Sequence, residues 1–485
     1  MAGVRGSLLS SSTCLFPMRL LRLVAACATL FVATAHGADP AVILSGVPWY
    51  EENGDIVSAR SAGILREDGR FYLFGEFKRD RGNAFAGFSC YSSRYLVHWT
   101  FHRIALPVQP DGRAGPGRVG ERPKVLKCPA TGDYVMFFHS DDARYRDPAV
   151  AYATSPVIDG EYTFRGPLLF EDQPIRLWDM GVFQDDDGAG YLVTHSGNLF
   201  RLADDYRSVA TQVVANMTSG CESPAIFKRD GLYYWLGSGL TAWERNDNTY
   251  FTATSLAGPW QKRGNFAPTG TLTWNSQTTF VLPIRGAETT TWMFMGDRWA
   301  HPYQYSAATY VWQPLHFDAA GNLSLPRYLP AWSIDVASGR WSAAELPGSV
   351  VELDALGDRL VHSDAWTPHT DASGFTDFRS NVKDSTLSVT FTGTQIGFFG
   401  VARPDGGFGR VEITSAQGEV VARTVVETYC LYPEASLKFL SRPLPRATYT
   451  LTVTPLGERF FWQAKTTTYG SAGDYVSVQK LLIVD

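Results

Sequence analysis

The chain carries one short pattern five times: a polar or acidic residue, a short apolar strand, a turn, and an aromatic-rich strand. The copies begin at residues 60–64, 121–125, 179–183, 222–226 and 277–281. Two predicted strands and a turn in every copy are typical of one blade of a β-propeller. The first strand of each blade lines the propeller axis, so the residues at its entrance should converge. We therefore expect Glu121, Asp179, Glu222 and Gln277 to share one pocket.

Length and composition narrow the class of protein. At 485 residues the chain is too long for a single ordinary core, which favours two domains. Aromatic residues make up 13% of the chain, a value that suits all-β folds and clefts that face sugar rings. The formal charge of −5 without a basic run argues against nucleic acid as a partner. No stretch reaches the roughly 20 apolar residues of a membrane span. The protein is expected to be a monomer.

The predicted fold class is all-β, with a five-bladed β-propeller at residues 39–341 followed by an antiparallel β-sandwich at residues 342–485. The sandwich is predicted from strict alternation of apolar and polar residues in the runs 386–391, 409–414, 448–453 and 476–483. It is expected to be carbohydrate-binding-like or purely structural. Four aromatic residues are candidates for a sugar platform, although such residues are more often part of a core: Trp366, Tyr429, Tyr432 and Trp462.

Residues 1–38 are interpreted as a signal peptide, with a basic start at 18–22, an apolar run at 23–32 and small residues after it. The expected location is therefore the periplasm or the medium, which are oxidising compartments. The remaining cysteines allow three disulfide pairings, and free buried thiols are equally compatible with the sequence: Cys90, Cys128, Cys221 and Cys430.

Carboxylates that meet in one cleft repel each other, which raises the pKa of at least one and keeps it protonated. A protonated acid opposite an activated water is what cleavage of a glycosidic bond requires. The alternative is that each carboxylate only accepts hydrogen bonds from backbone N–H groups at the entrance of a repeat. No metal or cofactor is expected, because residues 185–188 indicate a β-turn rather than a calcium loop.

Three segments, residues 121–125, 178–180 and 222–228, resemble glycoside hydrolase family 43, in particular its exo-β-1,3-galactanase branch. The resemblance extends over roughly residues 48–340 and implies a five-bladed propeller. It implies an inverting enzyme that releases galactose from the non-reducing end of a polysaccharide or oligosaccharide. By the same resemblance Glu222 is the general acid, Asp179 positions it, and Gln277 holds the attacking water with help from Glu121. The residues implied to line the sugar site are Glu76, Tyr145, Asn198, Thr241 and Trp243.

One position departs from that branch. Its first blade normally opens with an Ala-His-Gly-Gly type of segment, whereas this chain has Arg60 there. Arg60 is a candidate substrate contact, and a structural counter-ion for the acidic ring is an equally good interpretation. Three alternatives stay open: an α-L-arabinofuranosidase or β-xylosidase of the same family, a non-catalytic carbohydrate-binding propeller, and a scaffold that binds another protein.

Overall fold

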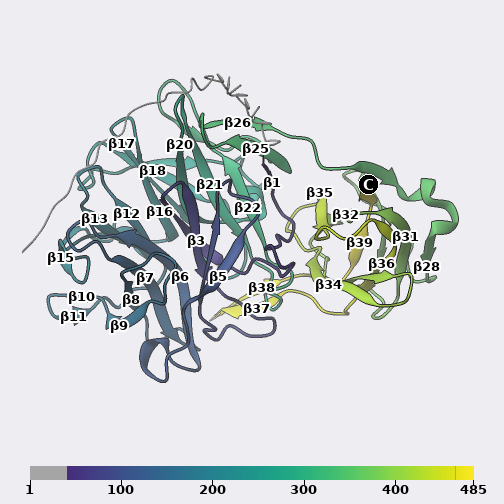
Figure 1. Ribbon diagram of the computed structural model, residues 1–485, viewed down its shortest axis with the longest axis horizontal. Coiled ribbons are helices and arrows are strands. Elements are labelled where there is room, and N and C mark those ends of the chain that lie inside the picture. The colour runs from purple at the N-terminus through teal and green to yellow at the C-terminus, as the bar shows by residue number, and fades with distance from the viewer. Residues whose placement is uncertain (1–40, 465) are drawn as a thin grey trace, which may run out of the picture. The chain divides into compact units, whose positions relative to one another are not determined.

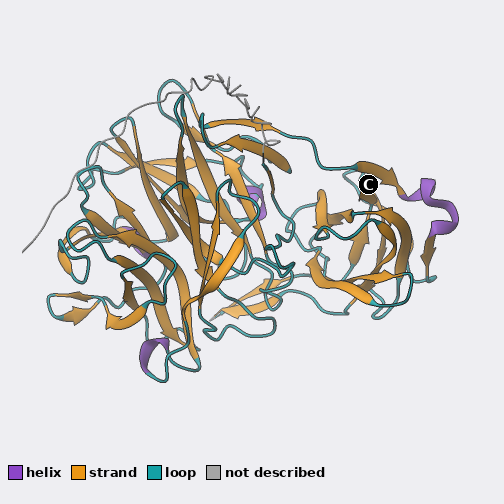
Figure 2. Ribbon diagram, in the orientation of Figure 1, coloured by secondary structure: helices purple, strands orange, loops and turns teal. Residues whose placement is uncertain are grey.

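The computed structural model describes residues 41–464 and 466–485, and strands dominate throughout (Figure 2). The all-β prediction is confirmed. The predicted signal peptide, residues 1–38, lies outside the described residues. The helical turns are short: η1 (Gly112–Ala114), η2 (His195–Gly197), α1 (Leu272–Asn275) and η3 (Leu353–Arg359). No helix of the described residues is long and apolar enough to cross a membrane.

Each sequence repeat forms its own antiparallel sheet, numbered here sheet 1 to sheet 5 in chain order (Figure 1). Sheet 1 contains β2 (Arg60–Glu67), β3 (Arg70–Glu76), β4 (Phe88–Ser93) and β5 (Thr100–Leu106). Sheet 2 contains β6 (Arg118–Lys127), β7 (Tyr134–Asp142), β8 (Ala149–Ser155) and β9 (Thr163–Pro167). Sheet 3 contains β12 (Met180–Gln184), β13 (Gly190–Thr194), β14 (Asn198–Leu202) and β15 (Val209–Val214). Sheet 4 contains β16 (Glu222–Arg229), β17 (Leu232–Ser238), β18 (Thr249–Ala253) and β19 (Gln261–Asn265). Sheet 5 contains β20 (Gln277–Arg285), β21 (Thr290–Arg298) and β22 (Thr309–Pro314).

The first strands of the five sheets contact one another in a closed cycle: β2 with β6, β6 with β12, β12 with β16, β16 with β20, and β20 with β2. The aromatic second strands fill the space between neighbouring sheets. Phe74 of sheet 1 and Phe138 of sheet 2 lie in one buried cluster, and Tyr234 of sheet 4 and Phe294 of sheet 5 lie in another. The repeat therefore brings the entrances of all five first strands together.

Four of the five first strands have a β-bulge at the entrance. The register shifts fall after Arg60, Glu121, Glu222 and Thr278, whereas β12 pairs with β13 without a shift. A bulge places two residues opposite one and turns the backbone locally. In sheets 1, 2 and 4 the bulged residue has a left-handed backbone, with φ of 49° at Ser61, 55° at Arg122 and 58° at Ser223.

These bulges turn three backbone N–H groups toward carboxylates of the preceding sheet in the cycle. The pairs are Ser61 to Asp297 at 3.0 Å, Arg122 to Glu76 at 2.9 Å and Ser223 to Asp179 at 2.8 Å. A hydrogen bond to a charged acceptor contributes about 1.5–3 kcal/mol. Three pairs of neighbouring sheets are thus joined by hydrogen bonds at the entrances of their first strands.

Short pairings complete the first part of the chain. β1 (Val42–Leu44) pairs with β25 (Ala331–Asp335), which also pairs with β26 (Arg340–Ala343). Two hairpins are formed by β10 (Leu169–Phe170) with β11 (Gln173–Pro174) and by β23 (His316–Phe317) with β24 (Leu323–Ser324).

The C-terminal region, residues 349–485, consists of further antiparallel sheets. One contains β27 (Ser349–Glu352), β40 (Lys480–Val484), β32 (Gln395–Ala402) and β35 (Glu434–Leu440). Another contains β28 (Leu360–His362), β31 (Leu387–Gly393), β36 (Ala447–Pro455), β33 (Phe408–Ser415) and β34 (Val420–Glu427). Smaller sheets contain β29 (Thr367–Thr370), β30 (Thr376–Ser380) and β39 (Val476–Val478), and β37 (Phe461–Ala464) with β38 (Thr467–Gly470).

The two larger C-terminal sheets share one hydrophobic core. Phe398 and Leu481 of one sheet and Val389 and Val453 of the other belong to the same buried cluster, which also includes Trp366. The alternating runs found in the sequence are strands, as predicted. All four cysteines of the described residues are buried free thiols, so of the alternatives left open by the sequence the structure has the unpaired one.

Candidate active site

The entrance residues of sheets 2 to 5 meet, and a residue that the sequence analysis did not single out joins them. The buried guanidinium of Arg122 pairs with Asp179, with 2.9 Å between Nε and Oδ1. The same group donates from Nη2 to Oε1 of Gln277 at 2.9 Å. Arg122 therefore fixes one acidic and one amide side chain of the site at the same time.

The amide of Gln277 is held on all sides. Its carbonyl accepts hydrogen bonds from Arg122 and from the indole Nε1 of Trp299 at 2.9 Å. Its nitrogen donates to the Ser238 hydroxyl at 2.9 Å and to Oε1 of Glu222 at 3.3 Å. The carbonyl oxygen of Gln277 already accepts two hydrogen bonds, so a ligand can bind only to its nitrogen. The contact most easily replaced there is the one to Glu222, which is the longest of the four.

Gln277 follows a left-handed turn. All four residues of α1 have φ between 52° and 57°, which costs non-glycine residues about 1–2 kcal/mol each. Side chains hold this turn in place: Asp247 accepts from the N–H of Leu272 at 2.9 Å, and Arg298 donates to the carbonyl of Trp274 at 3.0 Å. Backbone strain of this kind persists where the surroundings over-determine it, often at functional sites.

Glu222 is the carboxyl group that stays protonated. Burial raises its pKa well above the ordinary value, the charge of Asp179 raises it further, and the cation of Arg122 opposes both only in part. A backbone hydrogen bond from Thr241 also works against the rise. Glu222 can therefore carry a proton near neutral pH, as a general acid must.

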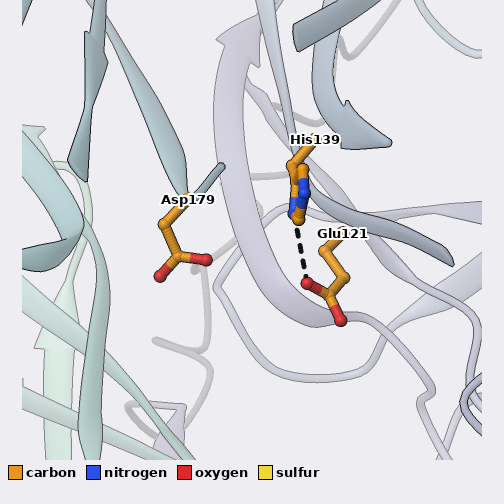
Figure 3. A group of neighbouring side chains, drawn as sticks. All are labelled: Glu121, His139 and Asp179. Atoms are coloured by element: carbon orange, nitrogen blue, oxygen red, sulfur yellow. Dashed lines mark hydrogen bonds and ion pairs between the residues drawn. The ribbon is translucent and has the colours of Figure 1, made fainter. Parts of the chain in front are cut away.

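Glu121 is in the opposite state. Burial works against its ionisation, but the hydrogen bond from His139, the charge of Lys78 and the hydrogen bond from Tyr145 outweigh burial and lower its pKa to about 2. Figure 3 shows the ring of His139 directed at this carboxylate, with 3.2 Å between Nδ1 and Oε2. Tyr145 donates its hydroxyl to the other oxygen at 2.7 Å. The site thus combines a protonated acid and an ionised carboxylate.

His139 supplies positive charge to this part of the site. Burial disfavours its charged form, but hydrogen bonds to Asp141 and Glu121 raise its pKa to about 9. Its two ring nitrogens lie 3.2 Å from Glu121 and 3.2 Å from Asp141. Glu121, His139 and Asp179 offer ligand atoms within 4.8 Å of one another, as a metal site would (Figure 3). In the protonated imidazole both nitrogens are donors, so His139 forms an ion-pair network with Glu121 and Asp141.

Three of the other expected site residues lie around these groups. Tyr145 is 38% exposed and touches Glu121, which places it at the rim of the site. Thr241 contacts Glu222 through its backbone, while its hydroxyl donates to the carbonyl of Glu244 at 2.6 Å. Trp243 is buried against Trp299, with ring centroids 5.0 Å apart.

Asn198, Glu76 and Arg60 are buried, and their hydrogen bonds support the protein itself. Asn198 donates to the carbonyl of His195 at 2.9 Å and accepts from the N–H of Asn216 at 2.9 Å. Glu76 accepts from the N–H of Arg122 and pairs with Lys78 at 2.6 Å.

Arg60 has no exposed surface, donates to the carbonyl of Ala308 and stacks on Tyr310, 4.2 Å from the ring centroid. This position favours a structural role over a contact with substrate.

Two central residues, Arg122 and His139, were not predicted as site residues. His139 is the cross-strand partner of Glu121 on β7, so aligning the ends of the second strands would have found it. Arg122 lies one residue after Glu121, in the segment that carries the family resemblance. The alternative in which the carboxylates only accept backbone N–H groups fits Asp179 in part, because Ser223 donates to it. Glu121 instead accepts hydrogen bonds from the side chains of Asn83, His139 and Tyr145.

Comparisons with known proteins agree with this geometry. The family described as glycosyl hydrolases family 43 matches residues 58–300. The chain is 26% identical to an exo-β-1,3-galactanase from Phanerochaete chrysosporium solved with galactose, over 91% of this chain and 100% of that one, with a TM-score of 0.67. A substituted form of that enzyme, solved with β-1,3-galactotriose, matches at 26% identity over the same shares, with a TM-score of 0.65.

A protein from Bifidobacterium bifidum, provisionally named an exo-β-1,3-galactanase, is 36% identical over 58% of this chain and 95% of that one, with a TM-score of 0.55. A search of curated proteins gave no match. The match of the family over half of the chain and the relatives named here lead to one conclusion: this chain is a glycoside hydrolase that belongs to the glycosyl hydrolases family 43.

Proposed function

We propose that this enzyme is an inverting, exo-acting β-1,3-galactanase that releases galactose from the non-reducing end of β-1,3-linked galactan or arabinogalactan. The proposal rests on the opposite pKa shifts of two carboxyl groups of one site: the pKa of Glu222 lies well above its ordinary value, and that of Glu121 is lowered to about 2. The substrate class is supported by the relatives, one of which was solved with galactose and with β-1,3-galactotriose.

The reaction follows from the protonation states. Glu222 gives its proton to the glycosidic oxygen as the bond from that oxygen to the anomeric carbon breaks. A water oxygen forms the new bond to the anomeric carbon from the opposite face, which inverts the configuration. Asp179 stays out of the proton transfer: it is paired with Arg122 and accepts from the N–H of Ser223, and its charge keeps Glu222 protonated.

The water needs a group that orients it and a group that accepts its proton. Gln277 offers only donors, because its carbonyl is already hydrogen-bonded to Arg122 and Trp299. Its nitrogen can hold the water when Glu222 turns from Gln277 to the glycosidic oxygen. Glu121 is the ionised acceptor close enough to raise the pKa of Glu222, and in this proposal it takes the proton of the water.

The same proposal includes the architecture and the location. The closed cycle of first strands supports a five-bladed β-propeller at residues 39–341, with Tyr145, Thr241 and Trp243 at the sugar site. The shared core of the two larger C-terminal sheets supports a β-sandwich at residues 342–485. The basic and apolar residues at the start of the chain support export. The proposed enzyme is a monomer.

The test uses the mature protein with β-1,3-galactan, β-1,3-galactotriose and aryl galactoside, arabinofuranoside and xyloside substrates. Stepwise release of galactose as the α-anomer, seen by NMR within the first minutes, is the expected result. Release of arabinose or xylose would agree with glycoside hydrolysis but would refute galactan as the substrate. Formation of the β-anomer would reject inversion.

Glu222→Gln is the matching variant. It should abolish hydrolysis of galactotriose while calorimetry still detects binding, because the amide keeps the shape of the side chain but carries no transferable proton. Glu67→Gln on the opposite end of sheet 1 is the control, since Glu67 pairs with Lys127 away from the site. Full activity of Glu222→Gln would refute its assignment as the acid.

A further inference from the structure

Two segments of the active site are held by side chains of the C-terminal region. The first is residues 241–245, which contacts Glu222 through the backbone of Thr241 and carries Trp243. The second is the left-handed turn α1, which leads into Gln277. The described residues from both regions belong to one compact unit, Pro40–Asp485.

The 241–245 segment is secured by β34 and the residues after it. Tyr429 donates its hydroxyl to Oε2 of Glu244 at 2.6 Å, and both residues are buried. Arg245 forms an ion pair with Glu427 between side chains that are only 1% and 5% exposed. These two anchors directly follow Trp243 in the chain, so they fix where this loop stands.

Trp243 itself also packs against a residue of the C-terminal region. The indole of Trp462, on β37, meets Trp243 edge-on with centroids 6.2 Å apart at 87°, and meets His301 at 5.0 Å and 82°. On its other side Trp243 packs against Trp299, which donates to Gln277. A short series of contacts thus joins the C-terminal hairpin β37–β38 to the amide of the site.

The strained turn α1 has its own anchors. Arg298 donates to the carbonyls of Trp274 at 3.0 Å and Asn275 at 3.2 Å, and it pairs with Glu434 of β35 at 3.3 Å. Tyr432 donates its hydroxyl to the carbonyl of Thr271 at 3.1 Å. Because four consecutive left-handed residues are unfavourable on their own, this turn depends on such contacts.

We propose that the C-terminal region is a positioning part of the active site: through Tyr429, Glu427 and Trp462 it holds the 241–245 segment, and through Glu434 and Tyr432 it holds the turn before Gln277. The catalytic consequence rests on the proposed function, whereas the anchoring does not. Tyr429 and Trp462, which the sequence offered as sugar-platform candidates, act as positioning residues. Misplacing a catalytic group by about 1 Å can lower the rate about 100-fold, so anchors outside the site can control kcat.

The test uses full-length variants. Tyr429→Phe removes one hydroxyl and keeps the ring, and Trp462→Ala removes the contact with Trp243, with Trp462→Phe as the conservative variant. Phe461→Ala is the matched control, because Phe461 is the neighbouring residue on β37 and is 57% exposed. The readouts are hydrogen exchange of the amides of residues 239–246, followed by mass spectrometry, and kcat and KM on β-1,3-galactotriose.

Trp462→Ala and Tyr429→Phe should accelerate exchange in residues 239–246, and Trp462→Ala should lower kcat about 10- to 100-fold with little change in KM. Trp462→Phe should recover most of the loss, and Phe461→Ala should match the wild type. The alkaline limit of kcat should move to higher pH in Trp462→Ala, because a loosened Thr241 no longer lowers the pKa of Glu222.

Unchanged exchange in both variants would overturn the proposal. Faster exchange with unchanged kcat would also overturn it, because the position of the loop would then be irrelevant to catalysis. If the wild type hydrolyses no galactan, the proposed function fails, and the exchange measurement still decides whether the C-terminal region anchors the loop.

Discussion

Replacing Arg122 with methionine is the most informative perturbation of this site. It removes the pair with Asp179 and the hydrogen bond to Gln277, both at 2.9 Å, and leaves the backbone bond to Glu76 intact. Asp179 is then a buried carboxylate that retains the N–H of Ser223 but has lost its cation. Removing one partner of a buried ion pair costs about 3–5 kcal/mol. Gln277 still accepts a hydrogen bond from Trp299, so the loss of its hydrogen bond from Arg122 adds little to the destabilisation.

A loss of about 3–5 kcal/mol is a large share of the 5–15 kcal/mol that stabilises a typical domain. Urea unfolding measures it directly, with the midpoint lowered and the slope unchanged. Arg122→Lys keeps the charge but offers a compact ammonium in place of the fork, so it should fall between Arg122→Met and the wild type. The control is Arg66→Met, since Arg66 is exposed on the first strand of sheet 1. A loss below about 1 kcal/mol in Arg122→Met would refute the reasoning, because that is the size expected of an ordinary substitution.

Three further predictions concern charge and cysteine. Asp179→Asn removes the charge that raises the pKa of Glu222, so the alkaline limit of kcat/KM should move to lower pH; a shift to higher pH would contradict this electrostatic account. His139 has a folded pKa of about 9, above its ordinary 6.5, so its stabilisation is complete below pH 6.5 and is lost as pH rises through 9. The stability difference between wild type and His139→Gln should therefore shrink by about 3 kcal/mol between pH 6 and 10 in urea titrations, and a constant difference would exclude a charged His139. Because the four described cysteines are free, a reducing agent should leave the thermal unfolding midpoint unchanged.

The repeat predicted the convergence of the entrance residues because every first strand begins at the same place in its sheet. It did not predict Arg122, because neighbouring residues of a regular strand point to opposite faces. The bulge after Glu121 removes that alternation and leaves both side chains at the site. The sequence does contain a signal: Pro123 and Pro224 follow the bulged residues, and proline within a strand is typical of a bulge.

The roles of Tyr429 and Trp462 could not come from periodicity. By pattern alone, an aromatic residue in a β-rich segment is more often part of a core than of a sugar platform, and the pattern does not identify its partners. What distinguishes these alternatives is a contact with residues nearly 200 positions away in sequence, such as that of Tyr429 with Glu244. The complete burial of Arg60 likewise depends on a distant contact, because its stacking on Tyr310 joins the first and the last sheet of the cycle.

The repeat alone could not say which carboxyl group is the acid, because it makes Glu121 and Glu222 equivalent; only the family resemblance indicated Glu222. The residue across the ladder makes them different. Glu121 pairs with His139, a cation, and Glu222 pairs with Ser238, a neutral hydroxyl. A buried carboxyl group hydrogen-bonded to a cation ionises, whereas Glu222 keeps its proton because burial and the charge of Asp179 outweigh the cation of Arg122. The first strands bring the two carboxyl groups together, and the residues opposite them on the second strands help to determine which one is the acid.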